Sequence, residues 1–283
     1  MYYDITTPDA AYYWIYDTLQ INQGKLLESY LLKCDKDINL FCEMYAEKIE
    51  KMDIENIEII AFQVTSNSDN CESVKKYGIR NLQWILSNDT ELNKLLQRNG
   101  IFFNVEQKTM CINGKKYDID YNKYRDGSVG RKDKLESIAH KIFYDFQINA
   151  FLFCKDIADY SVIYRMPEFL FTLAQFSKEA KLVEDIWIEQ NETYIIKYKA
   201  KMEEFAWFTF YGNEMEFCDD RNKNYQHLKN KLVALAIDGM HGELPDDVFA
   251  YMKQDTVILP ENILEIIPAG EWRTNVLKYF GET

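Results

Sequence analysis

The sequence predicts an α+β fold in which a helical N-terminal region precedes a domain of mixed helices and strands. In residues 9–52, apolar residues recur at three- and four-residue spacing, as in helices that bury one face. From Ile57 onward, compact apolar runs of strand length alternate with amphipathic segments bounded by glycines and polar capping residues. The chain has 283 residues, of which 47% are apolar, so it can bury the core of one large domain or two small ones.

The first region spans residues 1–56 and the second spans residues 57–283. In the first, Asp9 after Pro8 predicts a helix start, and Gly24 predicts a break between two helices. Aromatic residues cluster in the first of these helices: Tyr12, Tyr13, Trp14 and Tyr16. Because no basic residues lie between these rings, packing against the rest of the chain is favoured over stacking on nucleic-acid bases.

The second region opens with a strand at residues 57–66, IEIIAFQVTS, which is apolar along most of its length, as in strands buried on both faces. A polar turn follows at residues 67–70, and a short helix then ends on Gly78, the residue type that most often terminates helices. We therefore expect a central strand whose C-terminal end opens on a cleft shared with residues 150–168.

The later elements follow from local signals such as capping residues, glycines and prolines. In chain order they are a helix at 90–100, a hairpin turning at Asn113-Gly114, an exposed loop at 121–134, a helix at 135–147, a strand at 148–154, a helix begun by Pro167, β-rich stretches at 186–200 and 204–212, a helix at 224–237, and a strand at 255–270 interrupted at Pro260.

Charge excludes some classes of function. Lysines and arginines number 33 against 46 acids, which gives a net charge of −13. This balance argues against a passive clamp on duplex DNA and against adhesion to an anionic membrane. The only notable basic cluster lies in the 121–134 loop: Lys123, Arg125, Arg131, Lys132 and Lys134. If the target were nucleic acid, this cluster should line the cleft, but a solvated loop is the favoured interpretation.

The N-terminus has no basic segment typical of a signal peptide, and no apolar run reaches membrane-spanning length, so a cytoplasmic location is expected. Six scattered cysteines without a C-x-x-C spacing then indicate reduced thiols: Cys34, Cys42, Cys71, Cys111, Cys154 and Cys218. No metal site is predicted, because the three histidines lie far from any cysteine pair. The glycine-rich nucleotide motifs and the serine hydrolase motif are also missing from the sequence.

The strand, turn and helix at residues 57–82 resemble the opening of the ADP-ribosyltransferase-like fold. In DNA-targeting bacterial ADP-ribosyltransferase toxins and in RNA 2′-phosphotransferases, this segment reads H-x-T, a turn, then a helix ending in G-[IL]-x-x-L. Here it reads Gln63-Val64-Thr65, the turn, and KKYGIRNL at 75–82. The stretches at 146–170 and 255–268 are similar to a later strand with its loop and to the closing strand, so the resemblance covers residues 57–268 in pieces.

This resemblance implies a mixed, mainly antiparallel β core and the use of NAD as a co-substrate. It implies that Gln63 and Thr65 hold the nicotinamide ribose and that Asn67 also binds the cofactor. It further implies that Tyr164 or Arg165 contacts the dinucleotide. The sequence departs from the family at Gln63, which replaces a histidine and can form hydrogen bonds but cannot titrate.

The family also needs a catalytic carboxylate that stabilises positive charge on the ribose. The best candidate is Glu243 in the segment HGELPDD, and Glu168 in RMPEFL is the second. Both also fit ordinary surface or capping carboxylates. Glu168 follows Pro167 in a first helical turn, where negative charge is favourable without any catalytic role.

Two functions remain open at this stage. The first is NAD-dependent transfer of ADP-ribose to a macromolecule, protein or nucleic acid, in a conflict between a bacterium and its viruses. The second is a catalytically inactive module, acting as a toxin, defence factor or inhibitor, that binds a partner protein through an acidic, aromatic surface. The missing histidine and the ambiguous glutamate favour the second, and the strand, turn and helix at 57–82 favour the first.

Overall fold

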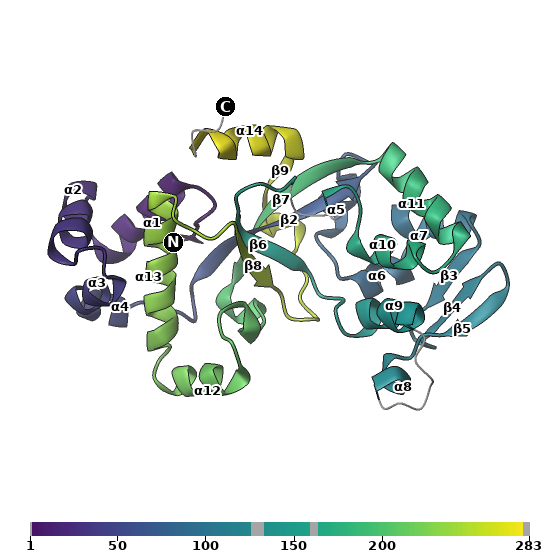
Figure 1. Cartoon of the computed structure of the whole chain (residues 1–283), viewed down its shortest axis with the longest axis horizontal. Helices are drawn as coiled ribbons and strands as arrows, with labels where there is room; N and C mark the ends of the chain where they lie inside the picture. The colour runs from purple at the N-terminus through teal and green to yellow at the C-terminus, as the bar shows by residue number, and fades with distance from the viewer. Residues whose placement is uncertain (1, 126–132, 159–163, 280–283) are drawn as a thin grey trace.

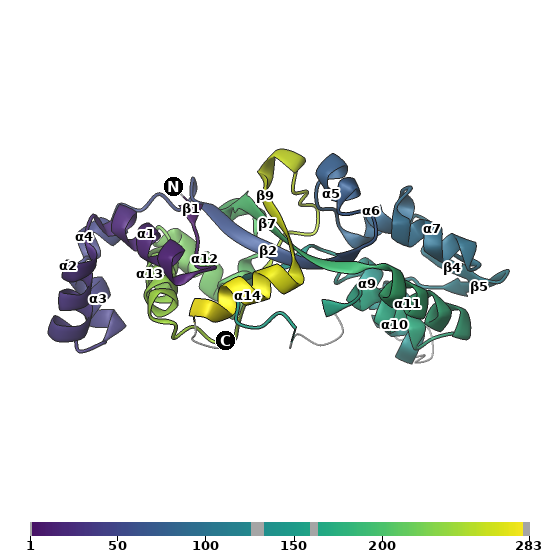
Figure 2. The same cartoon turned by 90° about the horizontal axis from the view of Figure 1, so that it is seen from above.

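The computed structural model describes residues 2–125, 133–158 and 164–279. The molecule is elongated, with the N-terminal helices at one end, a β-sheet in the middle and a lobe of helices with a small second sheet at the other end (Figures 1 and 2). Strands in both sheets pair antiparallel except for one short parallel pair, so the α+β class predicted from the sequence is confirmed. No helix in the described part of the chain has the length and apolar character needed to cross a membrane.

The N-terminal region is helical, as predicted. Its elements are α1 (Pro8–Leu19), α2 (Gln23–Leu27), a π-helical turn (Glu28–Lys33), α3 (Ile38–Met44) and α4 (Ala46–Glu50). Thr7 caps α1 by accepting a hydrogen bond from the Ala10 N–H at 3.2 Å. The break between α1 and α2 lies at Gln20, whose φ of 49° is left-handed. The expectation of a break at Gly24 was wrong, because Gly24 lies within the first turn of α2.

The main sheet has the strand order β8-β6-β2-β7-β9. Its strands are β2 (Glu58–Asn67), β6 (Asn149–Cys154), β7 (Glu192–Lys201), β8 (Asp247–Tyr251) and β9 (Ile263–Pro268), and β1 (Tyr2–Tyr3) pairs with the start of β2. β2 is central, as the apolar run at 57–66 predicted, and it pairs with β7 along its whole length. β8 was not anticipated, because DVFAY is short and only partly buried.

One hydrophobic core joins residues 1–56 to the sheet. α1 packs against α13 (Gln226–His241), and both cover one face of the sheet. Trp14 of α1 is buried and meets the Tyr3 ring edge to face, with centroids 4.8 Å apart. The packing interpretation of the aromatic cluster is therefore confirmed for Trp14. On the other face, α14 (Ala269–Tyr279) places Trp272 on Phe62 of β2.

A lobe with its own hydrophobic core lies beyond the C-terminal end of β2 (Figure 1). Its elements are α6 (Leu82–Ser87), α7 (Glu91–Arg98), β3 (Ile101–Asn104), β4 (Thr109–Ile112), β5 (Lys115–Asp118), α8 (Tyr121–Arg125), α9 (Asp133–Phe143), α10 (Glu168–Ala174) and α11 (Lys178–Gln190). The Asn113-Gly114 hairpin is confirmed, and both residues have left-handed φ angles. Part of the expected 121–134 loop is helix α8, and residues 126–132 lie outside the described residues.

The stretch expected to be β-rich at 186–200 is confirmed from Glu192 onward as β7, whereas its first residues and the stretch at 204–212 are not strands. Residues 186–190 are the last turn of α11, in which Ala180, Val183 and Trp187 are buried at helical spacing. Residues 202–204 and 207–209 form short 3₁₀ turns that lead into α12 (Glu214–Asn222). Aromatic content suggested strands in both places, but spacing and burial, rather than residue type, decide the local structure.

Candidate functional site

A cleft of about 690 Å³ lies where the main sheet meets the lobe. β6 pairs with β2 only at Phe62 and Phe151. Past that point, within the described parts of the chain, no further strand pairing involves this edge of β2, and its residues border the cleft. Residues 63–67 of β2 line the cleft, as the sequence predicted. Of the described residues in the segment 150–168 that was expected to share it, only residues 166–168 line the cleft. Its other walls come from residues 69–94 and 145–149.

Three of the residues predicted to bind the cofactor line this cleft: Gln63, Thr65 and Asn67. Gln63 and Thr65 project from the same face of β2, since side chains alternate along a strand. Asn67 has a structural task, because its Oδ1 accepts hydrogen bonds from the N–H groups of Asp69 (2.8 Å) and Cys71 (2.9 Å). This arrangement fixes the turn that starts α5 (Glu72–Tyr77).

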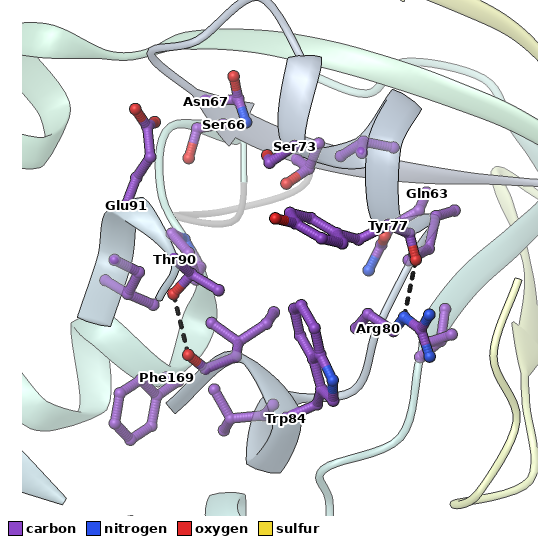
Figure 3. Close-up of a pocket in the computed structure, with 18 of the residues that line it drawn as sticks. Gln63, Ser66, Asn67, Ser73, Tyr77, Arg80, Trp84, Thr90, Glu91 and Phe169 are labelled. Carbon is purple, nitrogen blue, oxygen red and sulfur yellow. Dashed lines mark hydrogen bonds between the residues drawn. The ribbon is translucent and has the colours of Figure 1, made fainter. Parts of the chain in front are cut away.

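We call the group formed by Lys76, Tyr77, Arg80 and Trp84 the aromatic corner. The Tyr77 and Trp84 rings border the cleft with centroids 5.7 Å apart (Figure 3). Arg80 lies over the Trp84 ring at 5.2 Å and donates from Nε to the Tyr77 carbonyl oxygen at 2.7 Å. Lys76 lies over the Tyr77 ring at 4.7 Å. The corner therefore joins two aromatic rings to two cations.

A glycine makes the aromatic corner possible. Gly78 ends α5 with a φ of 73°, and a Cβ at this position would lie 1.9 Å from the Ile258 carbonyl oxygen. The chain then bridges to Ile258 through Ile79 and turns into α6, whose N-cap is Asn81. Only a residue without a side chain allows this close approach. The helix end on Gly78 that the sequence predicted is confirmed.

The two cations of the aromatic corner have no counter-ion among the residues that the structure describes. Glu72, an acid of the same helix, is paired with Lys75 at 2.6 Å. Across residues 2–125, 133–158 and 164–279, neither Lys76 nor Arg80 has a carboxylate oxygen within 4.0 Å. A planar group with an attached anion therefore fits this corner, because rings stack on the aromatic faces and the cations attract negative charge.

A second wall of the cleft carries an ion network, which we call the Asp145 network: Lys141, Asp145, Gln147, Asn149 and Glu168. Lys141, 17% exposed, contacts Asp145 and lies 2.8 Å from Glu168. Burial opposes the positive charge of Lys141, but hydrogen bonds to the two carboxylates outweigh burial and raise the lysine pKa. Lys141 is therefore charged at neutral pH.

The structure brings Glu168 to the cleft but not Glu243. Glu168 lies in the first turn of α10 and lines the cleft. Glu243 follows Gly242, the left-handed residue that ends α13, and its Oε1 lies 3.5 Å from Lys36 Nζ in the N-terminal region. It does not line the cleft. The break after α13 directs the chain away from the C-terminal half of β2.

Tyr164 and Arg165 precede the cleft wall in sequence but do not line it. Tyr164 packs against the core on the α14 face, and its carbonyl oxygen accepts a hydrogen bond from Thr193 Oγ1. Arg165 is exposed. The neighbouring Met166 is buried and lines the cleft.

The basic cluster of the 121–134 segment is not at the cleft where it is described. Lys123 is paired with Asp118, and Lys134 Nζ donates to the Gln175 carbonyl oxygen at 2.6 Å. Arg125 is exposed at the end of α8. Arg131 and Lys132 lie outside the described residues. The described members of this cluster therefore do not form a rim of the cleft.

Sequence reasoning missed the aromatic corner and the Asp145 network. The signal for the first was Tyr77 and Trp84 on either side of the turn at Gly78. The signal for the second was a run of alternating polar residues before a buried strand, DFQIN at 145–149. Within the described residues, no group of three or more histidine, cysteine, aspartate or glutamate side chains could hold a metal ion. Comparisons with protein-family models, curated proteins and solved structures found no match.

Proposed function

We propose that this cleft binds NAD and that the chain transfers ADP-ribose from NAD to a macromolecular target. The observation that carries the proposal is the edge of β2 left bare where β6 departs, which lies beside the aromatic corner. A strand edge without a partner strand offers free backbone donors and acceptors to a bound ligand. The rings of the corner can stack a base or pyridine ring, and Lys76 and Arg80 can balance a diphosphate.

In the proposed reaction, the bond between the nicotinamide nitrogen and the ribose C1′ breaks, and its electron pair leaves with nicotinamide. A lone pair of the target then forms the new bond to C1′, and the target group loses a proton to solvent or a nearby base. Positive charge develops on the ribose between these events, so a fixed carboxylate lowers the barrier. Glu168 is the residue that we assign to this role, because it lines the cleft. Gln63 and Thr65 are assigned to the ribose hydroxyls.

A second candidate function is a catalytically inactive module that binds a partner protein. One observation favours it: Lys141 lies 2.8 Å from Glu168 and offsets the negative charge that catalysis would use. Gln63, which cannot titrate, also favours this second function. In this case the cleft and the acidic surface would serve only recognition.

The experiment is an assay of nicotinamide release from NAD by the full chain. We expect Glu168→Gln to lower the rate about 100- to 1,000-fold, with a much smaller change in NAD affinity, by analogy with other electrostatic stabilisers. Thr65→Ala should instead raise the NAD concentration required. Glu243→Gln is the matched control, because it makes the same change outside the cleft, and it should keep the wild-type rate. A wild type that releases no nicotinamide at millimolar NAD would leave only the binding module.

A further inference from the structure

Asp145 fixes the orientation of two neighbouring side-chain amides. Its Oδ1 accepts hydrogen bonds from Gln147 Nε2 at 3.0 Å and from Asn149 Nδ2 at 3.4 Å. Its Oδ2 accepts from Lys141. An ionised carboxylate can only accept, so the NH₂ groups of both amides must face Asp145. Their carbonyl oxygens are therefore held away from it.

Both carbonyl oxygens lack a donor. Gln147 Oε1 and Asn149 Oδ1 are shielded from solvent and have no hydrogen-bond partner in the part of the chain that the structure describes. A buried acceptor without a donor is destabilising, because it has lost its hydrogen bonds to water. Both residues are among those that line the cleft. A ligand that brings N–H groups to this wall restores the missing hydrogen bonds.

The Asp145 network is also electronegative. It contains two carboxylates, Asp145 and Glu168, and one cation, Lys141, so its formal charge is −1. The aromatic corner on another wall of the same cleft carries two cations that no carboxylate of the described residues pairs with. The cleft thus offers an acceptor-rich, negative wall and a donor-rich, positive one.

NAD⁺ has a matching division of charge. Its pyridinium ring is positive and bears a carboxamide whose NH₂ group donates two hydrogen bonds, while its diphosphate is negative. Resting on the proposed function, we propose that the Asp145 network is the subsite that recognises the pyridinium carboxamide of NAD⁺, through the carbonyl oxygens of Gln147 and Asn149. The diphosphate then extends toward Lys76 and Arg80. Asp145 acts as a positioning residue, because it holds the amides and supplies negative charge.

This orientation predicts selectivity at the carboxamide. In nicotinic acid adenine dinucleotide, a carboxylate replaces the carboxamide and the rest of the molecule is the same. That analogue lacks the N–H donors and adds a negative charge beside acceptor oxygens and carboxylates. The Asp145 network therefore disfavours it through unpaired acceptors and like-charge repulsion. NAD⁺ should therefore bind at least about tenfold more tightly than this analogue, which is the ratio of affinities expected from losing one hydrogen bond to a charged or oriented group.

The test is calorimetric titration of the full chain with NAD⁺ and with nicotinic acid adenine dinucleotide. The wild type should bind NAD⁺ at least about tenfold more tightly than the analogue. Asp145→Asn, which removes the charge and frees both amides to rotate, should reduce this ratio to near one. Gln147→Met, which keeps the length of the side chain without its acceptor, should lower it severalfold. Asp118→Asn is the matched control, because it removes the same charge on β5 away from the cleft.

Each outcome decides between the two proposals. Equal affinity of the wild type for both dinucleotides overturns the subsite, and the proposed function then stands on nicotinamide release alone. Unchanged discrimination in a folded Asp145→Asn or Gln147→Met protein also overturns it. If Asp145→Asn does not fold, Gln147→Met decides. If neither dinucleotide binds the wild type at millimolar concentration, the subsite and the proposed function both fail.

Discussion

One hydrogen bond ties the lobe to the strand that lines the cleft. Trp187 Nε1 of α11 donates to Ser66 Oγ of β2 at 2.7 Å, and both residues are only 5% exposed. Trp187→Phe keeps an aromatic ring in place but removes the donor. Ser66→Ala removes the acceptor and leaves the indole N–H buried. In each case the remaining polar group has lost its partner while it stays largely buried.

The burial of the pair sets the size of the effect. A buried polar group without a partner costs about 1–3 kcal/mol of the free energy of unfolding, and each single variant should lose that amount. Trp187→Phe loses somewhat more, because the smaller ring also buries less apolar surface. In the double variant both polar groups are gone, so its loss should be smaller than the sum of the two single losses by about 1 kcal/mol.

The assay is urea unfolding followed by far-ultraviolet circular dichroism, since tryptophan fluorescence changes with the substitution itself. The free energy of unfolding should fall with urea concentration at a comparable slope in the wild type, the two single variants and the double variant, so that differences in the unfolding midpoint report differences in stability. Additive losses in the double variant would refute the reasoning, because independent effects mean that the two side chains are not coupled by a hydrogen bond. Single losses below about 0.5 kcal/mol would refute it as well, since that is the size expected of surface changes.

Three further predictions concern the frame of the site. Gly78→Ala should lower the free energy of unfolding by about 2 kcal/mol or more and weaken NAD binding, because its Cβ would clash with the Ile258 carbonyl. Urea unfolding measures the first effect and calorimetric titration the second. Asp220→Ala should lower the free energy of unfolding, measured in urea, by about 2–3 kcal/mol, because the buried carboxylate accepts hydrogen bonds from two N–H groups at the start of α13 and from one tyrosine hydroxyl. Burial raises the pKa of Tyr3 and Tyr198, so the folded state keeps protons that the unfolded state loses near pH 10. The free energy of unfolding should therefore fall as pH rises past that value, and the tyrosinate absorbance that these two side chains contribute should appear only with unfolding.

Local signals in the sequence predicted much of the fold. The left-handed glycine at the end of α5, the Thr90 cap of α7 and the Asn113-Gly114 turn each depend on the conformation of a few neighbouring residues. The central position of β2 followed from its apolar run. These features could be predicted because the energy that decides them is local. α11 could not, because the burial of Trp187 depends on packing against the lobe and on Ser66.

Apart from Glu168, the site was predicted only along one strand. Gln63 and Thr65 were placed at the cleft because they end the central strand, whereas the other walls depend on long-range contacts. The bridge between Ile79 and Ile258 anchors the aromatic corner, and the hydrogen bond from the Leu82 N–H to the Phe146 carbonyl sets α6 beside the Asp145 network. No spacing in the sequence encodes such contacts. The same reason explains why sequence alone could not distinguish Glu168 from Glu243.

Binding of NAD⁺ at the aromatic corner is the central claim, and calorimetric titration of two tyrosine variants tests it most directly. Tyr77, 38% exposed, borders the cleft, and Tyr13, 64% exposed, lies on α1 at the other end of the molecule. Loss of a ring that stacks on a base costs about 1–3 kcal/mol, so Tyr77→Ala should weaken NAD⁺ binding about 5- to 150-fold. Tyr13→Ala should bind as the wild type does. Equal affinity of both variants, or no NAD⁺ binding by the wild type, would contradict the claim.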